Sequence, residues 1–161
     1  MEKLNEITVT QILDIKTVPT EKGVIGKMVD RPGYGILFCE KGKLVFNHNG
    51  KKIISDAKHA VLFPKGSTYT RYDDENGLLY VINFDCLEKL CDEFVVIEIE
   101  DTSVLIRNFE RMQMLSLFER NRAKIMSIFY DTLDRIVVSS TIDSILIPAL
   151  KYICLLYTSP S

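Results

Sequence analysis

Side chains that commonly carry out catalysis or bind metals are few in this sequence. It contains two histidines, His48 and His59, and four cysteines, Cys39, Cys86, Cys91 and Cys154. Four residues separate Cys86 from Cys91, and no second Cys/His pair follows, whereas zinc sites need about four closely spaced ligands. Nucleophile elbows, phosphate-binding loops and dinucleotide fingerprints are absent. The sequence therefore predicts no catalytic residue, no metal and no cofactor, and it favours binding over turnover.

One alternating segment carries polar side chains that suit ligand binding. Tyr69, Arg71 and Asp73 are spaced two residues apart, so they lie on the same face of an extended strand. This face is either a polar surface in contact with solvent or a set of polar groups inside an otherwise apolar cavity. In the second case, the polar groups orient a small ligand.

Short apolar runs, rich in β-branched and aromatic residues, predict strands through the first hundred residues. Turns are predicted at Glu40–Lys43 and at Asn47–Gly50, where the Asn-Gly pair accepts positive φ. Pro64–Gly66 is predicted to form a tight corner. Strands with turns at this spacing indicate an antiparallel sandwich or barrel. The predicted strands are Ile7–Ile15, Val24–Val29, Tyr34–Cys39, Leu44–Asn47, Lys52–Ile54, Ala60–Phe63, Thr68–Tyr72, Leu78–Phe84 and Phe94–Ile99.

After Asp101 the apolar spacing becomes helical. Thr102 or Ser103 can cap a first helix that runs to about Phe118 and carries Leu105, Phe109 and Met112 on one stripe. A second helix, from about Arg122 to Val138, and a third that begins near Ile142 are expected, with a boundary or kink near Pro148. One apolar face of the second helix carries Ile125, Ile128, Phe129, Leu133 and Ile136.

Composition describes an ordinary soluble globular chain of about one domain. The 161 residues are 47% hydrophobic and 26% charged, with a formal net charge of −2, which excludes disorder and gives no sign of a nucleic-acid-binding face. The N-terminus lacks the apolar stretch of a signal peptide, and no run is long enough to span a membrane. We therefore expect a cytoplasmic protein with free thiols and no membrane partner.

The last residues, Cys154–Ser161, are typical of a translated sequencing adapter rather than of a natural helix. Such segments are excluded from fold reasoning. We expect the natural sequence to end in this chain near Ile153 and to continue in the gene beyond it.

Several segments, in this order and spacing, resemble the effector-binding and dimerisation domain of AraC-type transcriptional regulators. They are Arg31–Phe38, Glu40–Leu44, Ala60–Tyr69 and Tyr80–Phe84, and more weakly Ile147–Ile153, which is similar to the lead-in to that family's helix-turn-helix domain. The resemblance implies a mainly β fold with C-terminal α structure, that is, a cupin-like double-stranded β-barrel (jelly roll) followed by two to three helices. Residues 1–100 would form the effector-binding barrel and residues 101–153 a helical dimerisation segment that leads toward a helix-turn-helix domain absent from this chain.

The resemblance also implies where an effector would bind. In the family, an arginine at the position of Arg31 reaches a sugar, and a guanidinium offers several fixed donors to hydroxyl or carboxylate oxygens. The alternative is a surface arginine paired with Asp30. Tyr69, Arg71 and Asn83 are the other candidate effector-binding residues. Leu79 and Val81 stand where the family often has polar or aromatic sugar contacts, so three alternatives are open: the barrel binds a sugar, a different small molecule, or no effector.

Cupin barrels also include metal-dependent enzymes, so the metal-binding pattern of that fold is informative. His48 follows Gly42 at the expected spacing, but Gly50 stands where a second histidine is required. Tyr69 replaces the histidine that would follow Pro64-x-Gly66. Too few ligands remain for a first-row metal. Both histidines are expected to be turn residues, with His59 exposed.

The resemblance further implies a homodimer that contacts DNA only through the absent domain. Ile125, Phe129, Leu133 and Ile136 are the candidate dimerisation residues; the alternative is that this stripe packs on the chain's own barrel. The leading hypothesis is the ligand-sensing and dimerisation portion of an AraC-family regulator, truncated before its DNA-binding domain. The second hypothesis is a stand-alone small-molecule-binding cupin or a cupin enzyme such as an isomerase or oxygenase.

Overall fold

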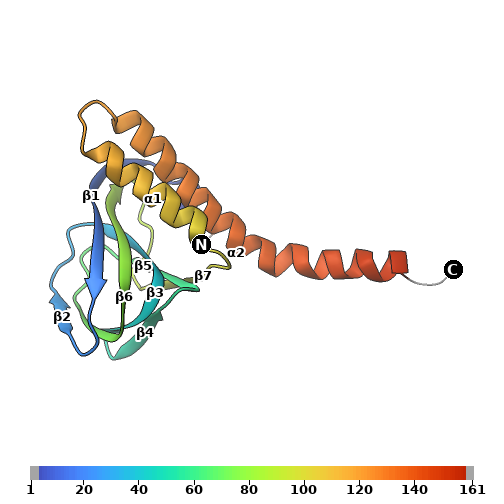
Figure 1. Cartoon of the computed structure of the whole chain (residues 1–161), viewed down its shortest axis with the longest axis horizontal. Coiled ribbons are helices and arrows are strands. Elements are labelled where there is room, and N and C mark those ends of the chain that lie inside the picture. Colours follow the sequence, from blue (N-terminus) through green and yellow to red (C-terminus); the bar gives the residue numbers. More distant parts are fainter. Residues whose placement is uncertain (1–3, 159–161) are drawn as a thin grey trace.

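The strands of the computed structural model form one curled antiparallel sheet with two helices packed over its outer face (Figure 1). The structure describes residues 4–158, without the side chains of residues 139–151, 154, 157 and 158. Strand order in the sheet is β1-β6-β3-β5-β7, while β2 pairs with β6 and β4 pairs with β3. The elements are η1 (Leu4–Glu6), β1 (Val9–Thr20), β2 (Ile25–Met28), β3 (Tyr34–His48), β4 (Lys51–Ser55), β5 (His59–Phe63), β6 (Tyr69–Cys86), β7 (Val95–Glu98), α1 (Ser103–Ser116) and α2 (Arg122–Thr158). The mainly β, cupin-like barrel with C-terminal helices is thus as predicted.

Two strands are much longer than the sequence predicts. β3 joins the two predicted runs Tyr34–Cys39 and Leu44–Asn47, and β6 joins Thr68–Tyr72 to Leu78–Phe84. The predicted turn at Glu40–Lys43 is therefore wrong, because the chain continues through it with shifts in the β3–β6 register. By contrast, the predicted hairpin turn at Asn47–Gly50 is confirmed, with positive φ at Asn49 (51°) and Gly50 (78°).

Glycines explain why the long strands bend rather than reverse. Gly42 has φ +103°, and Gly77 lies against it on β6, where an added Cβ would come 2.7 Å from the Gly42 Cα. Two backbones that approach this closely exclude side chains, as at strand bulges and barrel corners. Gly42 therefore serves a bulge between paired strands, a role that the local sequence does not distinguish from a turn.

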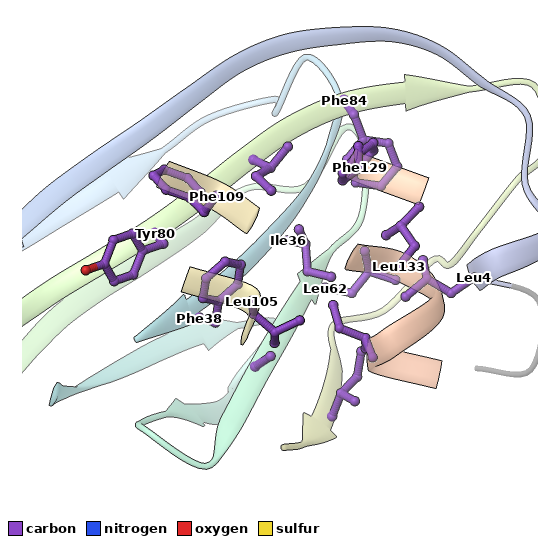
Figure 2. Packing of buried hydrophobic residues seen from close by; sticks show 14 of the residues in the cluster. Leu4, Ile36, Phe38, Leu62, Tyr80, Phe84, Leu105, Phe109, Phe129 and Leu133 are labelled. Atoms are coloured by element: carbon purple, nitrogen blue, oxygen red, sulfur yellow. The ribbon is translucent and has the colours of Figure 1, made fainter. Parts of the chain in front are cut away.

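Both faces of the central strands are buried, and successive side chains divide between two cores. On β3, Ile36 and Phe38 point outward toward the helices, whereas Leu37 and Cys39 point into the barrel. The outer core lies between the sheet and the helices (Figure 2). The barrel core is lined by the opposite face of the same strands. A strand covered on both sides appears as a continuous apolar run, as Tyr34–Cys39 does.

Helix α1 presents Leu105, Phe109 and Met112 to the outer core, as predicted. The Phe109 ring lies edge-on to Phe38, with centroids 6.0 Å apart, and 5.0 Å from the Tyr80 ring. These contacts anchor the helix across the middle of β3 and β6 (Figure 2).

Helix α2 covers the rest of the outer core, which corrects the predicted dimer seam. Phe129 and Leu133 are 0% exposed and Ile136 is 1% exposed, and the Phe129 ring packs 5.0 Å from that of Phe84. Ile125 is partly buried against the same core. Side chains covered by their own barrel are not free to contact a second copy, so the alternative of packing on the barrel describes Phe129, Leu133 and Ile136. A dimer contact through the partly exposed Ile125 stays a prediction.

The predicted second and third helices are one continuous helix, so the start near Ile142 is wrong. A boundary at Pro148 is wrong as well, whereas the other predicted alternative there, a kink, stays a prediction. Proline removes one backbone hydrogen bond, and helices with internal proline continue when the neighbouring turns remain bonded. The adapter-like tail overlaps the end of α2, and its last three residues lie outside the described part. Within that part, no helix is both long and apolar enough to cross a membrane.

Candidate functional site

A row of registered residues crosses four adjacent strands inside the barrel. Asp14 on β1 pairs with Asn83 on β6, which pairs with Gly35 on β3, which pairs with Phe63 on β5. Residues opposite one another in such a ladder have side chains on the same face. Because Gly35 has no side chain, the row has a gap between the Asn83 amide and the Phe63 ring.

The guanidinium of Arg31 fills this gap. A Cβ added at Gly35 would come 2.7 Å from the Arg31 Cζ and 2.9 Å from Nη1. On one side, Nη1 and Nη2 donate to the Oδ1 of Asn83 at 2.8 and 2.6 Å. On the other side, Cζ lies 4.7 Å from the centre of the Phe63 ring, a cation–π contact.

Arg31 is thus a buried arginine, and the predicted alternative of a surface pair with Asp30 is wrong. The residue is 5% exposed and lies in the loop between β2 and β3. Its backbone is tied to the Pro64–Gly66 corner, since Gly66 donates to the Arg31 carbonyl at 2.7 Å. The predicted corner is confirmed by φ +77° at Gly66. Its hydrogen bond to Arg31 helps to fix the backbone position from which the guanidinium enters the barrel.

Within the part of the chain that the structure describes, no carboxylate hydrogen bonds to the Arg31 guanidinium. Its acceptor is the neutral amide oxygen of Asn83, and Nε is buried without a hydrogen-bond partner among the described residues. Burial lowers the pKa of Arg31, opposed by the nearby Tyr69 and Asp14. A guanidinium in this state has donors left for an anion that enters the barrel.

Tyr69 and Arg71 enter the same space from the first half of β6. The Tyr69 ring packs 5.3 Å from Phe63 and 5.7 Å from Phe46, and burial raises the pKa of its hydroxyl. Arg71 forms an ion pair with Asp73, with Nε 2.8 Å from Oδ1, and this carboxylate is 1% exposed. The predicted polar face is thus inside the barrel rather than on its surface.

These side chains surround one cavity of about 260 Å³. All four predicted effector-binding residues, Arg31, Tyr69, Arg71 and Asn83, line it. The other lining residues are Lys16, Val18, Gly26, Lys27, Met28, Leu37, Phe46, Phe63, Leu79 and Val81. Among these lining residues, the charged groups are all cationic. Arg71 and Lys16 are paired with Asp73 and Asp14. The cavity therefore combines an apolar body with the buried guanidinium of Arg31, a setting suited to an anionic group on an apolar molecule.

The histidines lie in different places from those predicted. His48 is 8% exposed at the end of β3, where Nδ1 is 3.0 Å from the Thr68 carbonyl and the ring packs on Phe94. His59 begins β5 and its Nδ1 is 2.7 Å from Asp56, so it is half-buried rather than a free turn residue. Within the described residues, no three His, Cys, Asp or Glu side chains gather as metal ligands.

Cys39, Cys86 and Cys91 are free thiols, as expected. Burial raises the pKa of Cys91 to about 11. A thiol with a raised pKa is a weak nucleophile.

Sequence reasoning missed Gly35, Phe63, Asp14 and Lys16, which frame or line the site. One signal was available for Gly35, because a glycine inside a strand often marks the close approach of another group. The others become neighbours of the site only through cross-strand pairing.

Solved structures that align with this chain include ToxT and an RmlC-like cupin. ToxT from Vibrio cholerae O395 aligns with a TM-score of 0.52 and 10% identity, covering 76% of this chain and 53% of ToxT. ToxT bound to (E)-4-(8-methylnaphthalen-1-yl)but-3-enoic acid aligns with a TM-score of 0.51 and 9% identity, covering 74% of this chain and 53% of that one. An RmlC-like cupin from Shewanella frigidimarina NCIMB 400 aligns with a TM-score of 0.40 and 15% identity, covering 46% of this chain and 67% of the cupin.

At these identities the likeness to ToxT shows a shared fold, and this chain spans about half the length of the ToxT chains. No protein-family model and no curated protein matches the sequence.

Proposed function

We propose that this barrel is the ligand-sensing domain of an AraC-type regulator and that its ligand is a small organic anion. The observation that carries the proposal is the buried guanidinium of Arg31. Its hydrogen-bond acceptor is a neutral amide, and its Nε has no partner in the described part of the chain. Buried charges are ordinarily paired, because an isolated charge in an apolar setting is costly. A ligand carboxylate supplies the missing partner.

The cavity wall indicates what the rest of the ligand is. Leu37, Leu79, Val81 and Phe46 form an apolar surface, which cannot satisfy the several hydroxyl groups of a sugar. A volume of about 260 Å³ is slightly below the roughly 300–1,000 Å³ typical of sites for drug-sized ligands. We therefore favour a short aliphatic or single-ring carboxylic acid over the sugar that the resemblance suggested.

The shared fold supports a regulatory setting. ToxT is a regulator of the AraC type, and one ToxT structure contains a bound aryl butenoic acid. In our proposal, helices α1 and α2 pass the ligand state of the barrel to a DNA-binding domain, and two copies form a homodimer through a surface other than the buried stripe. The barrel binds and does not turn over its ligand.

Binding is tested with linear carboxylates from butanoate to decanoate and with benzoate, each beside its matching alcohol. Calorimetry should detect binding of at least one acid, and the alcohols should bind about tenfold or more weakly. At 100 times its dissociation constant, the acid should raise the free energy of unfolding by about 2.7 kcal/mol. Equal binding of acid and alcohol, or binding of no compound in the panel, would contradict the proposal.

The role of Arg31 is tested with Arg31→Met, and Arg111→Met is the matched control. Arg111 is an exposed cation on α1 that does not line the cavity. The first substitution should abolish the preference for the acid over its alcohol, and the second should leave it unchanged. If both variants lose the same small amount of affinity, long-range charge rather than a pocket arginine explains binding.

The regulatory setting is tested by sequencing the gene beyond the codon of Ile153. Two helix-turn-helix units are expected downstream. A stop codon within a few codons would instead favour a stand-alone small-molecule-binding cupin. Sedimentation velocity on the barrel with its helices tests the homodimer.

A further inference from the structure

Strand β1 connects the barrel to both helices through polar contacts. It pairs with β6 on one side and lies at the end of the strand order. Its contacts to the helices are the Val9 N–H donating to the Tyr130 hydroxyl (2.8 Å), Arg122 Nη2 donating to the Thr10 carbonyl (3.4 Å) and Gln113 Nε2 donating to the Thr17 hydroxyl (3.3 Å). A shift in β1 therefore reaches α1 and α2 directly.

Asp14 lies in the middle of this strand, at a point where its pairing is irregular. The register between β1 and β6 shifts between Ile12 and Asp14. Asp14 also lines an open groove of about 880 Å³ between β1 and the turn that joins the two helices. A strand is least constrained where its ladder is interrupted, so the side-chain contact of Asp14 contributes to the position of β1 there.

That contact is with Asn83, the residue that holds Arg31. Asn83 Nδ2 donates to Asp14 Oδ1 at 2.5 Å, while Asn83 Oδ1 accepts from both terminal nitrogens of Arg31. Both ends of one amide are thus occupied, so its orientation is determined by Arg31 on one side and Asp14 on the other. The Arg31–Asn83–Asp14 chain runs from the cavity to the helix-contacting strand.

A carboxylate that binds end-on to Arg31, across both terminal nitrogens, competes with the Asn83 oxygen for the same donors, whereas one held only at the free Nε does not. The end-on carboxylate is the stronger acceptor, because hydrogen bonds between ionised partners are about twice as strong as neutral ones. Asn83 then loses the contact that fixes its amide, and the bond to Asp14 loses its fixed geometry.

We propose that Asn83 is a positioning residue that reports occupancy of the cavity to β1: anion binding at Arg31 displaces the Asn83 amide, releases Asp14 and loosens β1 against the helices. This inference rests on the proposed function, because it requires an anion at Arg31. It adds the route by which that anion reaches α1 and α2. Coupling of this kind is reciprocal, so release of Asp14 also favours anion binding.

The first test needs no ligand. Asn83→Asp places a permanent carboxylate against Arg31 and a like charge beside Asp14, which imitates the occupied state. Hydrogen exchange should become several-fold faster in β1 than in the wild-type protein, with β5 (His59–Phe63) as the internal reference. A folded Asn83→Asp protein with wild-type β1 exchange would overturn the proposed coupling from Arg31 through Asn83 and Asp14 to β1, which we call the relay.

The second test uses octanoate and Asp14→Ala, which removes the acceptor for Asn83 Nδ2 at a partly exposed position and keeps the amide on Arg31. In the wild-type protein, octanoate should speed exchange in β1 relative to β5. In Asp14→Ala, octanoate should bind at least as tightly as it does to the wild-type protein, because release of Asp14 favours anion binding, and β1 exchange should be fast with and without it. If the variant retains the full octanoate effect on β1, the relay is wrong, and this arm decides even if Asn83→Asp does not fold.

The two proposals fail in different ways. Absence of octanoate binding to the wild-type protein, together with no binding of the other acids, counts against the proposed function, while the ligand-free arm still decides the relay. Normal octanoate binding without any change in β1 exchange overturns the relay and leaves the proposed function standing.

Discussion

At the residue scale, the site depends on the absence of a side chain at Gly35. The Arg31 guanidinium occupies the place where a Cβ would lie, between the Asn83 amide and the Phe63 ring. The small residue therefore determines where the Arg31 guanidinium can sit in the cross-strand gap. We expect substitutions at Gly35 to act through displacement of Arg31 rather than through strand geometry.

Gly35→Ala is expected to displace Arg31 and lower the free energy of unfolding by about 1–3 kcal/mol, the usual cost of overpacking a well-packed interior. Urea denaturation measures this loss, and calorimetry with octanoate measures the accompanying loss of affinity. Gly26→Ala is the matched control, since a Cβ there meets no atom within 4 Å, and it should change stability by no more than about 0.5 kcal/mol. Equal effects of the two substitutions would show that β propensity, not the Arg31 contact, is responsible.

At the scale of elements, α2 is held by a stripe that faces its own barrel. Leu133 and Phe129 are fully buried in the outer core, whereas Leu117, in the turn after α1, is 77% exposed. The covered face makes α2 part of the folding unit. Substitutions in the stripe therefore change the stability of the fold itself.

Leu133→Ala should lower the free energy of unfolding by about 2–5 kcal/mol, because it removes buried methyl groups and leaves a cavity. Leu117→Ala should change it by no more than about 0.5 kcal/mol. Chemical denaturation of both variants provides the comparison. A stably folded Leu133→Ala protein that differs from wild type only in self-association would restore the dimer seam that the burial excludes.

The contact between α1 and α2 should depend on pH through Asp131. Arg135 and then Asn108 hydrogen bond to this carboxylate, and both lower its pKa. The pKa of Asp131 is lower in the folded state than its unfolded value of about 3.9. The carboxylate therefore stabilises the folded state fully above that value, and this stabilisation is lost as pH falls through the folded pKa. The side chain is about half exposed, so solvent weakens the effect.

Urea denaturation should therefore show that Asp131→Asn loses less of its stability between about pH 5 and pH 2 than the wild-type protein does. At pH 7 the variant should be slightly less stable. Glu119→Gln, a change at an exposed carboxyl in the turn with no contact to Asn108, is the control. Identical acid profiles for wild type and Asp131→Asn would remove Asp131 from the acid response.

At the scale of the whole molecule, charge gives no basis for DNA recognition by this part of the chain. Basic and acidic residues nearly balance, with a net charge of −2, while specific DNA binding relies on many phosphate contacts from cationic side chains. In the proposed regulator, DNA is therefore contacted by another domain, and the barrel contributes the ligand response.

The chain should accordingly enrich no sequence from a random duplex library at physiological salt, with or without octanoate. Selection followed by sequencing measures this. Reproducible enrichment of one motif, confirmed by retardation that a scrambled duplex does not show, would place a recognition surface within these residues.

Local patterns in the sequence correctly predict the strand-rich first hundred residues, the helical end, the Asn-Gly hairpin and a short set of polar residues that line a cavity. These features depend on local periodicity and on backbone preferences of single residues, which are readable along the chain. The same local signals gave two wrong predictions. Gly42 lies at a bulge rather than in a turn, and the two predicted C-terminal helices form one.

Which residues contact one another in the site depends on the three-dimensional fold. Asp14, Asn83, Gly35 and Phe63 are far apart in sequence and become a row through cross-strand register, which depends on pairings among all four strands. Likewise, an apolar helical stripe shows that something must cover it, but not whether the cover is the chain's own barrel or a second copy. Burial depends on long-range packing, and the structure resolves it in favour of the barrel for Phe129 and Leu133.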